Sequence, residues 1–101
     1  MKRYTHQVED LKKEWIDSIT NFLKVRQLSS IKFKRSFVVK WFDNEFDNLA
    51  INITVKSVED NGNLICATPE NDDYNLSLND LDIYNVGYIL DILIDHNFII
   101  K

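Results

Sequence analysis

Hydrophobic and polar residues follow a helical period at the start of the chain and an alternating period after Ser30. Before Gln27, apolar side chains recur every three or four residues with lysines mostly between them, which is typical of an amphipathic helix. Thr5 is the predicted N-cap, and the helical pattern fades between Gln27 and Ser30. The apolar stripe of this helix consists of Val8, Leu11, Trp15, Ile19, Phe22 and Leu23.

Four stretches after Ser30 have the two-residue period of strands with one buried and one wet face. In the first of them, only Arg35 and Val38 interrupt the alternation. The sequence Glu-Asp-Asn-Gly at 59–62 is a hairpin turn between the second and third stretches, and Pro69 begins another turn before the fourth. The predicted strands are 31–41, 49–56, 64–68 and 74–78.

A second helix is predicted from about Asp80 to His96, with Asn79 or Asp80 as its N-cap. Its apolar residues spread over an arc of about 200° at 100° per residue, which is more than one sheet covers easily. Burial against the first helix and the sheet of a monomer is the favoured interpretation, and a second subunit or another protein is the alternative. Phe98, Ile99 and Ile100 extend this apolar surplus. The arc consists of Ile83, Val86, Ile89, Leu90, Ile92, Leu93 and Ile94.

These elements predict one α+β domain over residues 1–101. Short connections favour a four-stranded antiparallel sheet, a meander, with an N-terminal and a C-terminal helix packed on one face. The expected order is α-β-β-β-β-α. The arrangement looks like that of many short bacterial proteins in which helices flank a small sheet. No motif ties it to a named family, and the likeness implies no function.

The composition is that of a protein with its own core. Of 101 residues, 45% are hydrophobic and 28% are charged, so the chain is expected to fold alone. Cys66 is the single cysteine, which excludes an intrachain disulfide and favours a reducing compartment. No stretch approaches a membrane helix or the apolar region of a signal peptide. We therefore expect a cytoplasmic protein without a membrane contact.

The charge distribution is the strongest indication of a partner. Residues 57–100 contain nine Asp and Glu but no Lys or Arg, whereas residues 1–56 carry eleven cations and seven acids. The chain as a whole is acidic, with a net charge of −4. A lopsided field steers association and attracts opposite charge, although it does not indicate chemistry.

Several kinds of chemistry are not expected. Gly62 and Gly87 are the only glycines, so no glycine-rich loop can surround a phosphate. His6 and His96 stand at opposite ends of the chain, and neither has the spacing of a metal-binding motif. Cys66 lies in an apolar strand, where a thiol is usually an inert small hydrophobe. We therefore expect no cofactor, no metal and no enzymatic activity.

One polar constellation is the first place to look for an enzyme. Tyr84, Tyr88, Asp91 and Asp95 share the helical face opposite the apolar arc. The two carboxylates are one turn apart and could reach one Mg²⁺ or Ca²⁺, or act as an acid and a base. A hard cation needs about six oxygens and no third ligand stands at a fixed spacing, so we interpret these residues as a solvated helix face.

A basic segment suggests a second kind of partner. Between residues 24 and 40 there are six cations and no acid. Strand alternation places Lys32, Lys34 and Lys40 opposite Phe33 and Phe37, so bases could not stack on the aromatic rings beside these lysines. Contact with a phosphate backbone stays open. The six candidates are Lys24, Arg26, Lys32, Lys34, Arg35 and Lys40.

These observations lead to two hypotheses of function. The first is a small non-enzymatic protein–protein interaction module, with a homodimer as one form, that uses the apolar face of the second helix or the acidic loops. The alternative is a nucleic-acid-associated protein that contacts phosphates through the basic 24–40 segment. An acidic isoelectric point near 5.0 makes nucleic acid the less favoured partner.

Overall fold

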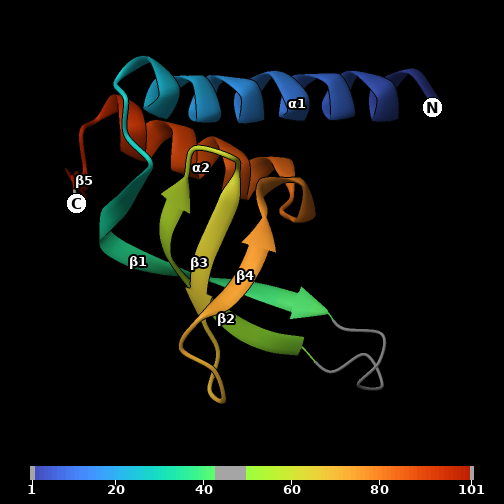
Figure 1. Cartoon of the computed structure of the whole chain (residues 1–101). Coiled ribbons are helices and arrows are strands. Elements are labelled where there is room, and N and C mark those ends of the chain that lie inside the picture. The colour runs from blue at the N-terminus through green and yellow to red at the C-terminus, as the bar shows by residue number, and fades with distance from the viewer. Residues whose placement is uncertain (1, 43–49, 101) are drawn as a thin grey trace.

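The computed structural model describes residues 2–42 and 50–100, which form two helices, a five-stranded antiparallel sheet and one 3₁₀ turn (Figure 1). Both helices lie on the same side of the sheet, and they run side by side in roughly the same direction. The elements are α1 (Lys2–Val25), β1 (Ser30–Phe42), β2 (Ala50–Glu59), β3 (Asn63–Ala67), β4 (Tyr74–Ser77), η2 (Leu78–Asp80), α2 (Ile83–Ile94) and β5 (Phe98–Ile100).

The sheet has five strands in the order β4-β3-β2-β1-β5, so the predicted four-stranded sheet is corrected by one strand. The first four strands are neighbours in chain order, as in a meander. After α2 the backbone reverses at His96, whose φ is 56°, and β5 pairs antiparallel with Ile31–Phe33. The observed order is therefore α-β-β-β-β-α-β. A segment of three residues is too short to show the two-residue period of a strand in the sequence. Residues 98–100 form a strand because they pair with the start of β1.

The helix α1 is amphipathic as predicted, but it starts earlier. It begins at Lys2, so Thr5 lies inside the helix and is not its N-cap. Residues 2–4 include no glycine or proline that would delay the start. The stripe is buried only in its second half, where Ile16 joins Ile19 and Leu23 in the core. The helix ends where Gln27 takes a left-handed φ of 56°.

The strand β1 changes its pairing partner along its length. Its first residues pair with β2 and β5, and a bulge then separates Lys32 from Phe37 in the β2 register. The interruption that Arg35 makes in the sequence pattern lies within this bulge. Beyond it, Phe37–Phe42 pair with β2 alone. The predicted alternation is preserved, because Ile31, Phe33 and Val39 are buried and the lysines of this strand are exposed.

The turn from β2 to β3 follows the prediction for Glu-Asp-Asn-Gly. Gly62 donates its backbone N–H to the Glu59 carbonyl and has a φ of +88°, a conformation that glycine adopts without strain. Leu49, at the start of the second predicted strand, lies outside the described residues, and β2 begins at Ala50. The structure therefore contains the predicted hairpin between β2 and β3.

The second helix has a different cap from the predicted one. Ser77 caps the 3₁₀ turn η2, and the Asp80 carboxylate accepts a hydrogen bond from the Ser77 N–H in return. Asp82 is the N-cap of α2, and its carboxylate accepts a hydrogen bond from the Asn85 N–H. Asn79 and Asp80 therefore belong to the 3₁₀ turn that precedes α2. Ser77, Asn79, Asp80 and Asp82 are all good N-cap residues, so the sequence pattern does not single out Asp82.

The apolar arc of α2 is largely used inside the molecule. Val86, Ile89, Ile92 and Leu93 join the core that α1 and one face of the sheet share. Trp15 of α1 packs beside Gly87, on another side of the helix. Ile94 remains 63% exposed at the end of the arc. Two neighbouring layers therefore cover a face that was too wide for one sheet.

Candidate functional site

The sheet face away from the helices carries the lysines of β1. Strand register places Lys32 beside Ile99 of β5 and Ser57 of β2, and Lys40 beside Asn52 of β2. We call this surface the open face, defined by Lys32, Val38, Lys40, Asn52 and Thr54. Their partners on the helix side of the sheet, such as Ile31 and Ile53, are buried. The lysines of β1 therefore project from the side of the sheet that no described helix covers.

The six cations of the 24–40 segment fall into two groups. Lys24 and Arg26 stand at the end of α1, where the Arg26 guanidinium lies 3.6 Å from the centre of the Phe22 ring and donates to the Phe22 carbonyl. Lys32, Lys34, Arg35 and Lys40 are exposed on β1. Four of the six cations thus follow a single strand, while Arg26 covers the last turn of a helix.

Beyond the residues that pair with β5, the described part of the chain pairs with β1 on one side only. The last contact on the β5 side is the hydrogen bond from the Lys34 N–H to the Asn97 carbonyl, at 3.0 Å. Within the described residues, Arg35–Phe42 make no backbone pairing on that side. We call this segment the free edge of β1. Every second residue along it directs both its N–H and its C=O away from β2.

The polar face of α2 stands above the free edge. The ring of Tyr88 meets the ring of Phe37 edge to face, with the centroids 4.9 Å apart. Tyr84 is 84% exposed, and Asp91 and Asp95 are also exposed. Asp95 is the C-cap of α2 and its backbone N–H bonds the Asp91 carbonyl. The four residues share one helix face as expected, and only Tyr88 of them packs against another element through its ring.

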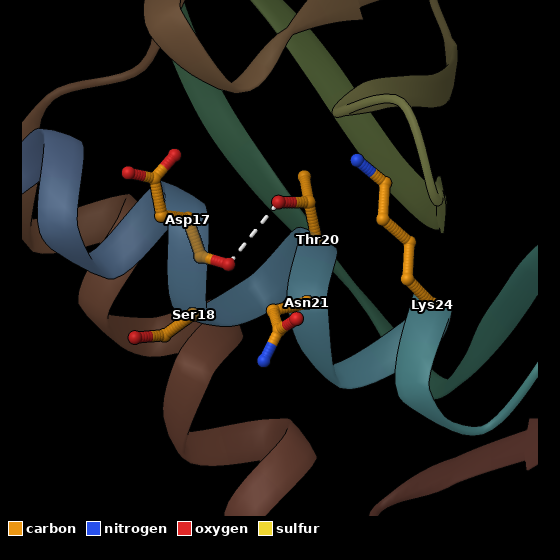
Figure 2. A pocket seen from close by; sticks show the side chains of 5 residues that line it. All are labelled: Asp17, Ser18, Thr20, Asn21 and Lys24. Carbon is orange, nitrogen blue, oxygen red and sulfur yellow. Dashed lines mark hydrogen bonds between the residues drawn. The ribbon is translucent and has the colours of Figure 1, made fainter.

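The four polar residues of α2 do not line the hollow that the described residues form on α1. In the described part of the chain, His, Cys, Asp and Glu form no group of three that could hold a metal ion. A shallow hollow of about 410 Å³ is lined by Asp17, Ser18, Thr20, Asn21 and Lys24. Figure 2 shows these five side chains along one helix, with the Thr20 hydroxyl donating to the Asp17 carbonyl. The side chains that line this hollow are all polar, whereas ligand pockets are typically clefts lined mainly by apolar side chains.

Cys66 is buried in the core between β2 and β4. It pairs with Val55 and Tyr74 and is free of any disulfide. Burial raises the pKa of the Cys66 thiol to about 11, and the positive charge of Lys56 lowers it by a smaller amount. Burial and a raised pKa are typical of a thiol that packs as a small apolar side chain in a core.

Raising the pH from 8 to 11 is expected to destabilise the fold through Cys66. The folded-state pKa lies above the ordinary value of 9.0, so the contribution to stability is complete below pH 9 and is lost as the pH rises through about 11. Urea unfolding measured across this range for the protein and for Cys66→Ala checks this. The free energy of unfolding of Cys66→Ala should decline less over this pH range, because the variant has no thiol to titrate. If the free energy of unfolding fell equally with pH in both proteins, the raised pKa of Cys66 would be contradicted.

Sequence reasoning located the cations and missed the free edge. The alternation of residues 31–41 predicts which side chains share a face, but not where each neighbouring strand ends. A signal was present in the length of the pattern, because eleven alternating residues exceed the usual strand of five or six. A strand that outruns its neighbours leaves part of its edge unpaired.

Among the described helices, none is both long enough and apolar enough to cross a lipid bilayer. No protein-family model matches this sequence, and the searches of curated proteins and of solved structures also found no match.

Proposed function

We propose that this protein is a small, non-enzymatic interaction module that binds an extended segment of a partner protein along the free edge of β1. One observation carries the proposal. β1 is 13 residues long, whereas β5 pairs with only Ile31–Phe33, so that from Arg35 onward the strand has one neighbour among the residues that the structure describes. An unpaired strand edge is a template for another strand, because the main-chain groups are already in position.

The surroundings of the edge support strand addition. The first half of the free edge is bordered by α2 on one side of the sheet and by the open face on the other. On the α2 side, the rings of Phe37 and Tyr88 provide aromatic surface. An added strand would lie end to end with β5 and continue the sheet beside β1. Main-chain hydrogen bonds would supply affinity, and the alternate side chains on the two faces would supply specificity.

The apolar arc of α2 is a weaker basis for this function. Its central residues, Val86, Ile89 and Leu93, are fully buried within the monomer. A partner could reach them only after α1 or the sheet had moved away. The exposed apolar side chains that remain, such as Ile94, are single positions on the surface. The contact surface that we propose is therefore the edge of β1.

Hydrogen exchange measured by NMR tests the proposal. A capped octapeptide of alternating threonine and valine serves as a neutral extended probe. We expect it to slow exchange of those N–H groups in 36–42 that point away from β2, because they gain a partner. The N–H groups that already bond β2, and those of β4 at the opposite edge, are internal references. Unchanged exchange at 36–42 at saturating peptide would contradict strand addition.

A parallel titration tests the alternative function. A labelled single-stranded oligonucleotide added at low and at physiological salt reports contact between phosphates and the exposed cations of β1. Binding that weakens steeply with salt, without any effect of the peptide, would favour a nucleic-acid-associated protein over the interaction module. No oligonucleotide binding at low salt would retire that alternative.

A further inference from the structure

We infer that the segment bound at the free edge is an acidic strand of a partner protein, with carboxylates on the open-face side and apolar residues on the helix side. This inference rests on the proposed function and adds the chemistry of the partner. It follows from the different side chains that border the edge above and below the sheet.

The open-face side of the edge is basic. Lys34 marks the end next to β5, and Lys40 lies six residues beyond it on the same face of the strand; both are exposed. Ser36 and Val38 stand between them, and no acid lies on β1. Along a strand this distance is about 20 Å, at roughly 3.3 Å per residue. An added strand would therefore meet a cation near each of its ends, where Asp or Glu side chains would complement them.

The helix side of the edge has a different chemistry. Phe37 is partly buried against Tyr88, and Val39 is buried in the core. Asp91 follows Tyr88 by one turn on the exposed surface of α2, so the positive charge of β1 is not continued on this side. Apolar side chains of the added strand would extend the Phe37 and Tyr88 contact. Alternation of acidic and apolar residues therefore fits both sides of the edge at once.

The same cations argue against a second copy of this chain at the edge. A symmetric pairing of two β1 strands would bring Lys34, Arg35 and Lys40 of one copy close to those of the other. Like charges facing each other across strands are destabilising, and lysines on edge strands commonly prevent such pairing. A partner with the opposite charge removes this repulsion. The acidic strand is therefore favoured over self-association through β1.

Two capped octapeptides test the inference. One alternates glutamate with valine, and the other alternates lysine with valine. Affinity is measured at low and at physiological salt, together with hydrogen exchange at 36–42. At low salt we expect the acidic peptide to bind about tenfold more tightly than the basic one, the factor that two or three exposed ion pairs supply. The difference should shrink as salt screens the charges.

A charge-reversed variant locates the effect. The double substitution Lys34→Glu with Lys40→Glu should reverse the preference, so that the basic peptide binds more tightly. The control is Lys13→Glu with Lys24→Glu, which changes the net charge equally on α1 and leaves the edge intact. All four lysines are exposed, so both variants are expected to fold. An equal response of the two variants would show a long-range effect of net charge and would overturn the inference.

The other outcomes separate this inference from the proposed function. Equal binding of both peptides, with slowed exchange at 36–42, would overturn the acidic partner and leave strand addition standing. No slowed exchange with either peptide, or with the neutral one, would overturn both. A mass that rises with protein concentration, and that the acidic peptide lowers, would identify a second copy as the occupant and overturn the separate partner. Oligonucleotide that displaces the acidic peptide would identify a polyanion instead.

Discussion

Phe33→Ala is expected to lower the free energy of unfolding by about 3 to 5 kcal/mol, the usual cost of removing a buried phenylalanine ring. Phe33 is 2% exposed, pairs with Phe98 of β5, and has its ring centre 5.8 Å from that of Phe37. The substitution would leave a cavity at the point where β1 holds β5. A domain of this size is stable by about 5 to 15 kcal/mol, so the loss is a large fraction of the total. Urea unfolding followed by circular dichroism measures it.

Val38→Ala is the matched control for Phe33→Ala. Val38 lies on the same strand and is 59% exposed on the open face, so we expect a cost below about 1 kcal/mol from strand propensity alone. Similar costs at the two positions would contradict the assignment of the two faces. The comparison also bears on nucleic-acid binding, since a ring that is buried in the core cannot stack on a base.

Gly87→Val is expected to destabilise the protein by about 1 to 3 kcal/mol through overpacking. A Cβ atom at position 87 would stand 2.9 Å from Cζ3 of Trp15, closer than side chains approach each other. Helix propensity predicts the opposite sign, because valine is a better helix former than glycine by a few tenths of a kcal/mol. The sign of the measured change in urea unfolding therefore reports whether α1 and α2 approach as closely as the structure shows.

A double-mutant cycle isolates this contact. In a Trp15→Ala background the indole ring is absent, and Gly87→Val should become neutral or slightly stabilising. The expected coupling between the two positions is about 1 to 3 kcal/mol. Additive effects of the two substitutions would show that the cost of valine arises elsewhere in α2. Trp15→Ala is itself costly, so the cycle needs protein that is still folded without denaturant.

The Phe33 prediction and the proposed function concern one arrangement of β1. Phe33 anchors the part of the strand that β5 covers, and Phe37 stands just beyond, where the free edge begins. The core side of the strand holds the fold together while the opposite side and the edge remain open to a partner. Substitution of a buried aromatic ring such as Phe33 should therefore change mainly the stability, whereas substitution of the exposed lysines should change mainly the binding of a partner.

The sequence alone predicted the elements with a strong local period. The amphipathic α1, the alternation of lysines and buried residues along β1 and the Glu-Asp-Asn-Gly hairpin were all visible, because period and turn chemistry depend on neighbouring residues. It also predicted that Cys66 is a core residue. The caps were harder: Thr5 and Asn79 were misassigned, since several Ser, Thr, Asn and Asp residues near a helix start are equally good candidates.

The tertiary structure decided what depends on residues far apart in the chain. Phe98–Ile100 form the strand β5 because they pair with Ile31–Phe33 of β1. The apolar arc of α2 is largely buried because Trp15 and the sheet pack against different sides of that helix. The candidate site follows the same division. Its cations and their shared face were predictable from alternation, whereas the free edge and the Phe37 and Tyr88 contact were not. Periodicity says which way a side chain points, but pairing between distant strands determines which backbone groups remain without a partner.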